Sequence, residues 1–154
     1  MDGTTMNAST DDRTMTLERT FRASPAQVYA AWTDPKHLPR WFGPDGFSCH
    51  TQVMDLREGG EWRFDMVGHG MTCPNRHRWT ALVPPERIEF LMDAGDDTEP
   101  PMAVMVRFSP EGTGTRLKQK VTFPSPESAS GARAYGAEEK GQETLTKLAA
   151  ALGE

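Results

Sequence analysis

Three potential metal ligands, His69, Cys73 and His77, recur at intervals of four residues. On an α-helix this spacing would place all three side chains on one face, as in helical zinc sites. Gly70 and Pro74 interrupt the stretch, Gly68 precedes it, and these residues disfavour a helix. We therefore expect no metal site here, and the sequence indicates no cofactor.

His77 is better explained as a hydrogen-bonding group. It has the same parity as Trp79 in a predicted strand, so the two side chains share one face. If that face is inward, His77 could bond the polar end of a ligand; a satisfied or surface histidine is the alternative. Arg19 also interrupts an apolar strand face, where it could neutralise a ligand carboxylate or pair with an internal acid.

No catalytic arrangement follows from the spacing of polar residues. The sequence has no Gly-rich phosphate loop, no Ser-His-Asp order and no pair of carboxylates that spacing alone would place in one cleft. We therefore name no catalytic residue, and the sequence favours a binding protein over an enzyme.

Wide aromatic rings and flexible methionines could line a cavity for an apolar molecule of irregular shape. The alternative is that each side chain simply fills the core, because large voids are rare in protein interiors. The aromatic and methionine set is Trp32, Trp41, Phe42, Trp62, Phe64, Met66, Trp79, Phe90, Met92 and Phe108. The ten predicted ligand-contacting residues are this set without Met92 and with His77 as the polar member.

The elements that would position these side chains follow from local patterns. Residues 14–22 alternate apolar and polar, the period of a half-buried strand. Ser24 followed by Pro25 opens a capping box and predicts the start of a helix. Asp34 followed by Pro35 repeats the signal, so a second short helix is predicted with Asp34 as its N-cap.

Antiparallel strands are predicted through the middle of the chain, at residues 47–57, 61–67, 76–83, 87–92, 102–109 and 115–123. In the second of these, Trp62, Phe64 and Met66 alternate with charged residues, so one face of the sheet is apolar and is expected to point inward. Residues 68–74, which include Cys73, are predicted to form a loop. Short turns between successive strands indicate a meander.

After Pro126 the chain becomes rich in helix formers. Small and apolar residues recur at three- and four-residue spacing from Ala137 to Leu152, which predicts one amphipathic helix whose start is loosened by glycines at 131 and 136. The predicted fold class is α+β. A curved antiparallel sheet of about six or seven strands wraps around the C-terminal helix, with two short helices after the first strand. A ligand cavity would form between sheet and helix.

Length and composition limit the remaining possibilities. With 154 residues, the chain fits a disordered arm over residues 1–12 and a single domain over residues 13–154. A net charge of −5, from 17 Lys and Arg against 22 Asp and Glu, disfavours nucleic acid as a partner. No apolar run is long enough to span a membrane. Two cysteines without a CxxC pair, and no signal-like N-terminal run, favour a cytoplasmic protein.

Several short stretches, taken in order, carry a resemblance that covers almost the whole chain after residue 13. They include Arg19-Thr20-Phe21, Ala31 to Pro35, Trp41 to Pro44, Arg57 to Trp62, Pro84 to Ile88, Gly114 to Leu117, and the terminal helix with Gly141 and Leu145. The sequence resembles the START-like (SRPBCC, helix-grip) superfamily, and within it bacterial proteins similar to the C-terminal domain of the activator of the heat-shock-protein-90 ATPase. It departs from that pattern at residues 68–74.

The resemblance implies the helix-grip fold, while its recurring elements look structural rather than catalytic. Members of the superfamily include ligand binders, cyclase-like enzymes and chaperone partners. Our leading expectation is a protein that binds a small, mainly apolar molecule between the sheet and the C-terminal helix. The alternatives are a chaperone-associated interaction module, or a cyclase- or lyase-like enzyme in which His77 or a nearby acid moves protons. The chain could act as a monomer or a homodimer.

Overall fold

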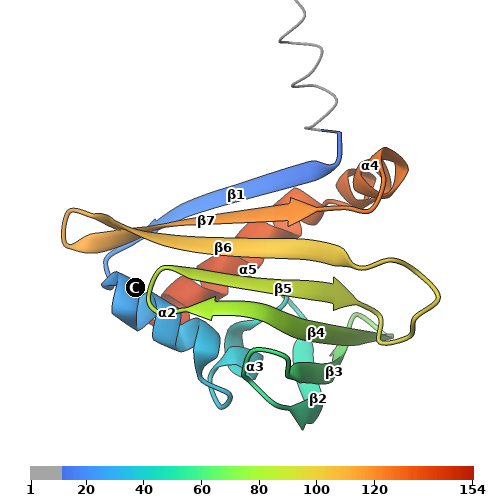
Figure 1. Ribbon diagram of the computed structural model, residues 1–154, viewed down its shortest axis with the longest axis horizontal. Coiled ribbons are helices and arrows are strands. Elements are labelled where there is room, and N and C mark those ends of the chain that lie inside the picture. The colour runs from blue at the N-terminus through green and yellow to red at the C-terminus, as the bar shows by residue number, and fades with distance from the viewer. Residues whose placement is uncertain (1–11) are drawn as a thin grey trace, which may run out of the picture.

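A seven-stranded antiparallel sheet forms the body of the protein in the computed structural model, which describes residues 12–154 (Figure 1). Its strands are β1 (Thr14–Phe21), β2 (Ser48–Met54), β3 (Glu61–Gly68), β4 (Met71–Val83), β5 (Arg87–Asp93), β6 (Met102–Glu111) and β7 (Gly114–Thr122). Its helices are α2 (Pro25–Thr33), α3 (Leu38–Trp41), α4 (Pro126–Ala134) and α5 (Ala137–Ala151). Of the predicted N-terminal arm, only Asp12 lies within the described residues.

The strand order is β1-β7-β6-β5-β4-β3-β2, so β2 to β7 form a meander and β1 pairs with β7 to complete the sheet. Helix α5 crosses behind the strands, with α2 near one end of the sheet and α4 at the other (Figure 1). The predicted α+β helix-grip fold is confirmed, with seven strands and two short helices after the first strand. None of the helices between residues 12 and 154 is both long and apolar enough to cross a bilayer.

The capping box at the start of α2 is confirmed. The Ser24 hydroxyl accepts from the backbone N–H of Gln27 at 3.3 Å, and the Gln27 side chain accepts from the Ser24 N–H at 2.9 Å. The expected start of the second helix was wrong. The Asp34 carboxylate accepts from the Lys36 N–H at 2.8 Å and closes a turn, so the helix begins only at Leu38.

The predicted loop over residues 68–74 was also wrong. Strands β3 and β4 continue until Gly68 pairs with Met71, leaving only His69 and Gly70 in the turn, both with positive φ. Two central residues with positive φ make a tight hairpin turn that suits the strand twist. Cys73 therefore lies in β4.

Two further boundaries differ from expectation. Strand β2 ends at Met54 rather than near Arg57, after a register shift between Thr51 and Val53. The helical C-terminal region is divided into α4 and α5, because Gly136 adopts a φ of 78° that an α-helix cannot contain. The predicted amphipathic helix is confirmed as α5 over Ala137–Ala151.

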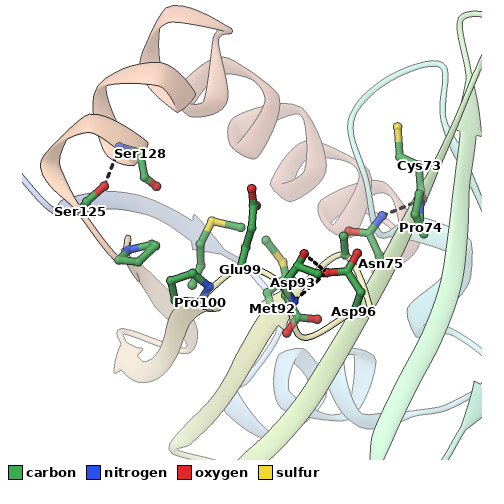
Figure 2. Close-up of a pocket in the computed structure, with 14 residues that line it drawn as sticks. Cys73, Pro74, Asn75, Met92, Asp93, Asp96, Glu99, Pro100, Ser125 and Ser128 are labelled. Atoms are coloured by element: carbon green, nitrogen blue, oxygen red, sulfur yellow. Dashed lines mark hydrogen bonds between the residues drawn. The ribbon is translucent and has the colours of Figure 1, made fainter.

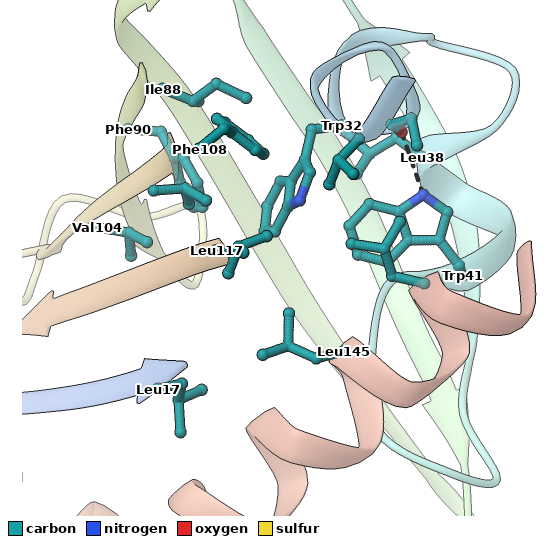
Figure 3. Packing of buried hydrophobic residues seen from close by; sticks show 14 of the residues in the cluster. Leu17, Trp32, Leu38, Trp41, Ile88, Phe90, Val104, Phe108, Leu117 and Leu145 are labelled. Carbon is teal, nitrogen blue, oxygen red and sulfur yellow. Dashed lines mark hydrogen bonds between the residues drawn. The ribbon is translucent and has the colours of Figure 1, made fainter. Parts of the chain in front are cut away.

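The core lies between the inner face of the sheet and the helices. Fully buried side chains include Val106 and Leu117 from the sheet and Leu145 from α5. Figure 3 shows Leu145 projecting from α5 toward Leu117 and Phe90. Helix α5 approaches β1 closely at Gly141, where an added methyl group would overlap Cδ1 of the buried Leu17.

Replacing Gly141 with Ala should therefore destabilise the protein by about 1 kcal/mol, because overpacking against Leu17 outweighs the gain in helix propensity. The matched control is Gly131→Ala in α4, where an added methyl group meets nothing within 4 Å. That change should stabilise the fold by about 0.5 kcal/mol. Urea unfolding measures the free energy of unfolding of both variants. Equal stabilisation by the two would show that a methyl group fits between α5 and Leu17.

Candidate functional site

A pocket of about 790 Å³ opens where β4, the β5–β6 connection and the start of α4 meet (Figure 2). It is lined by Cys73, Pro74, Asn75, Met92, Asp93, Ala94, Asp96, Thr98, Glu99, Pro100, Met102, Pro124, Ser125 and Ser128. These residues come from three separate segments of the chain: 73–75, 92–102 and 124–128.

Part of the pocket wall continues the inner face of the sheet. Because side chains alternate along a strand, Asn75 shares a face of β4 with the buried His77, and Met92 shares a face of β5 with the buried Phe90. Met102 begins the inner face of β6 in the same way. The pocket is thus at the end of the sheet's concave side, beyond the last buried side chains of β4 and β5.

Polar groups surround this apolar wall. Ser125 is the N-cap of α4, and its hydroxyl accepts from the Ser128 N–H at 3.1 Å. The Asn75 amide donates to the Cys73 carbonyl at 3.0 Å. The Asp96 carboxylate accepts from the hydroxyl and the backbone N–H of Thr98, which lowers the pKa of Asp96 and keeps it ionised.

An ion network that includes the pocket-lining Asp93 holds the β5–β6 connection in place. Arg76, which is 6% exposed, donates to Asp93 at 2.9 and 2.8 Å and to Asp97 at 2.9 Å. Arg78 donates to the same Asp93 at 3.0 Å. The hydrogen bonds from Arg76 lower the pKa of Asp93, and those from Asp93 and Asp97 raise the pKa of Arg76. Arg76 and Asp93 are therefore both charged at neutral pH.

The predicted ligand-contacting residues lie deeper, in one aromatic cluster. Trp62 stacks on Phe64 with ring centroids 3.7 Å apart, and His77 stacks on Phe90 at 4.5 Å. The ring of Phe42 meets Trp62, Phe64 and His77 edge-on at 5.0 to 6.0 Å. These rings fill the interior between β3, β4 and the chain that follows α3.

The structure brings most of the ten predicted residues together and buries eight of them: Trp32, Trp41, Trp62, Phe64, His77, Trp79, Phe90 and Phe108. Phe42 and Met66 are half-buried and pack against this core. None of the ten lines the pocket of Figure 2, although Met92 of the wider aromatic and methionine set does. Their contact with a ligand stays a prediction.

Two polar atoms inside this cluster have no hydrogen-bond partner within residues 12–154: Nε2 of His77 and Nε1 of Trp32. Other buried indoles are satisfied, since Trp41 donates to the Ala31 carbonyl and Trp62 to the Thr51 hydroxyl. Burial lowers the pKa of His77 to about 3, so its imidazole is neutral and only weakly basic. His77 is therefore suited to hydrogen bonding rather than to proton transfer near pH 7.

The other polar candidates, His69 and Arg19, each have a hydrogen-bond partner within the protein. Among the described residues, no group of three or more His, Cys, Asp or Glu side chains is placed to hold a metal ion. His69 Nε2 lies 3.1 Å from the Asp45 carbonyl oxygen. Arg19 donates to the Thr146 hydroxyl of α5 at 3.1 Å, rather than to a carboxylate across the sheet, and lies over the ring of Phe21.

Sequence reasoning missed the polar part of the pocket wall. Asn75 has the parity of His77 and Trp79, so extending β4 toward its start would have placed it on the inner face. Because residues 68–74 were predicted to form a loop, the alternation along β4 was not extended to Asn75. The joining of the β5–β6 connection with the start of α4 follows no sequence pattern.

The fold and the site together define an α+β helix-grip domain of the START-like superfamily, with a pocket at the end of its sheet. The chain matches the family of Activator of Hsp90 ATPase homolog 1-like proteins over residues 22–153 and belongs to that family.

Solved structures support this assignment. A protein from Chromobacterium violaceum is 30% identical, over 90% of this chain and 95% of its own, with a TM-score of 0.74. The AHSA1 protein from Silicibacter pomeroyi is 26% identical over 91% and 97% of the two chains, with a TM-score of 0.73. A Mycobacterium smegmatis protein has the same fold, with 24% identity over 93% and 92% and a TM-score of 0.82. No curated protein sequence matches the chain.

The lowered pKa of His77 predicts a pH-dependent stability. Between pH values of about 3 and 6.5 the unfolded chain protonates His77 and the folded chain does not, so stability falls as the pH falls. His77→Phe removes this contribution and the unpartnered Nε2. As the pH falls from 6 to 4, the free energy of unfolding should decrease by about 1.4 kcal/mol less per pH unit in the variant than in the wild type. Urea unfolding across this range measures the difference, and parallel curves would contradict it.

Proposed function

We propose that this protein binds a small, mainly apolar molecule on the inner face of its sheet, beneath the C-terminal helices. The pocket of about 790 Å³ at the end of that face is the observation that carries the proposal. Its volume is within the range of small-molecule sites, which are concave, largely apolar and supplied with a few polar groups.

The lining chemistry supports an apolar body for the ligand. Met92 and Met102 present flexible, polarizable thioethers that adapt to irregular shapes. Pro74, Pro100 and Pro124 add rigid apolar surface without a backbone donor. Such a wall favours a ligand through burial of apolar area rather than through many hydrogen bonds.

The aromatic cluster supplies the inner end of the proposed site. His77 Nε2 and Trp32 Nε1 are the polar atoms that a ligand entering past Met92 would satisfy, since a buried polar group without a partner is costly. The ten predicted residues would become an inner wall only if the packed cluster opens to admit the ligand, because none of them lines the pocket itself.

A chaperone-associated interaction module is the second candidate. The observation that favours it is the family itself, whose description refers to an activator of the Hsp90 ATPase. The two candidates are separable, because an interaction module needs no empty pocket and gains no stability from small molecules.

Filling the pocket should abolish ligand binding. Ala94 is exposed and lines the pocket, whereas Ala103 is exposed on the other face of β6, so Ala94→Trp and Ala103→Trp form a matched pair. Native mass spectrometry identifies a retained molecule, and thermal shift measures its effect. A ligand at 100 times its dissociation constant should stabilise the wild type and Ala103→Trp by about 2.7 kcal/mol.

The same ligand should give Ala94→Trp no thermal shift, because the indole occupies the volume. An undiminished shift in Ala94→Trp would place the ligand elsewhere. No retained molecule and no shift across a broad library of apolar compounds would contradict the binding function and favour the interaction module.

A further inference from the structure

The charges around the pocket are unevenly distributed. Its lining includes three carboxylates, Asp93, Asp96 and Glu99, and no Lys or Arg. From this we infer that the pocket selects its ligand by charge. It takes apolar molecules whose polar end is an amine or a hydroxyl, and it disfavours apolar carboxylates such as fatty acids. The inference rests on the proposed binding function and adds the chemical class of the ligand.

Two of the three carboxylates have no ion-pair partner among residues 12–154. Asp93 belongs to the ion network with Arg76, Arg78 and Asp97, in which two positive and two negative charges cancel. Asp96 bonds only neutral groups of Thr98. Glu99 forms no hydrogen bond or ion pair with any residue of the described chain, so the pocket side of the β5–β6 connection is left with two full negative charges.

The position of Glu99 makes its charge relevant to a ligand. Figure 2 shows its side chain projecting from the β5–β6 connection into the space between α4 and β4. A molecule lying against Met92 and Met102 would therefore bring its polar end close to the Glu99 carboxylate. An ammonium or hydroxyl group can donate a hydrogen bond there, whereas a carboxylate has no proton to donate and is repelled.

The start of α4 contributes the opposite sign, and it is the weaker contribution. A helix N-terminus is equivalent to roughly half a positive charge. Here the Ser125 hydroxyl already accepts from the Ser128 N–H, and Glu127 places a carboxylate in the first turn. The formal charges of Asp96 and Glu99 exceed this partial charge, so we expect a net negative potential beside the β5–β6 connection.

Decylamine, decanol and decanoate test the inference, because they share one chain and differ in the charge of the polar end. Titration of ¹³C-methyl methionine NMR signals at pH 7 reports binding at Met92 and Met102, with signals assigned through single Met→Leu variants. Met54 on β2 is the internal control. Affinity should fall from decylamine to decanol to decanoate, by about threefold at each step, the scale of exposed ion pairs.

The variant Glu99→Gln keeps the shape of the side chain and removes its charge. It should weaken decylamine binding about threefold, strengthen decanoate binding and leave decanol unchanged. The matched control is Glu86→Gln, since Glu86 is exposed in the β4–β5 turn at the opposite end of the sheet. That variant should bind all three compounds like the wild type.

The outcomes separate this inference from the function on which it rests. Equal affinity for decanoate and decylamine, with clear binding of decanol, would overturn charge selection and leave the binding function standing. An amine preference that persists in Glu99→Gln and disappears in Glu86→Gln would also overturn it. If none of the three compounds moves the Met92 or Met102 signals, the binding function fails and charge selection fails with it.

Discussion

The packing of aromatic rings on the inner face of the sheet is the constraint on which the rest of the structure depends. Trp62 and Phe64 are completely buried, and through Phe42 they tie the strands to the segment after α3. On β4 and β5 the last buried rings of the inner face are His77 and Phe90. Beyond these two rings β4 and β5 carry Asn75 and Met92, which are smaller or more flexible, and there the pocket opens.

Near the pocket, one face of β4 and β5 borders the pocket and the other carries an ion pair. On the inner face Asn75 and Met92 border the pocket, while on the outer face the neighbouring Arg76 and Asp93 form a buried ion pair. A buried ion pair adds little net stability, because desolvation offsets the attraction. Its geometric effect is clear, since Arg76 links Asp93 to Asp97 and so fixes the connection that carries Asp96 and Glu99.

Membership of the family accounts for the fold, but it does not identify the ligand. The stretches that carry the resemblance build the strands, the helix starts and the terminal helix, whereas the pocket is lined by residues 73–75, 92–102 and 124–128 outside those stretches. A shared fold with different side chains around its pocket is the usual way in which one scaffold serves several ligands.

The sequence by itself determined the elements whose causes are local. The capping box at Ser24, the alternation through Trp62 and Phe64, and the helical spacing from Ala137 each depend on neighbouring residues, and each was predicted correctly. The burial of His77 was also within reach, because strand parity places it with Trp79.

Only the tertiary structure decided the rest. The two-residue turn at His69 and Gly70 depends on β3 and β4 pairing along their full length, and this pairing turned a predicted loop into strand. The loss of hydrogen-bond partners around His77 Nε2, and the meeting of Glu99 with the start of α4, depend on residues far apart in the chain. Local patterns contain no information about such contacts, since they arise when the sheet curves and its distant segments come together.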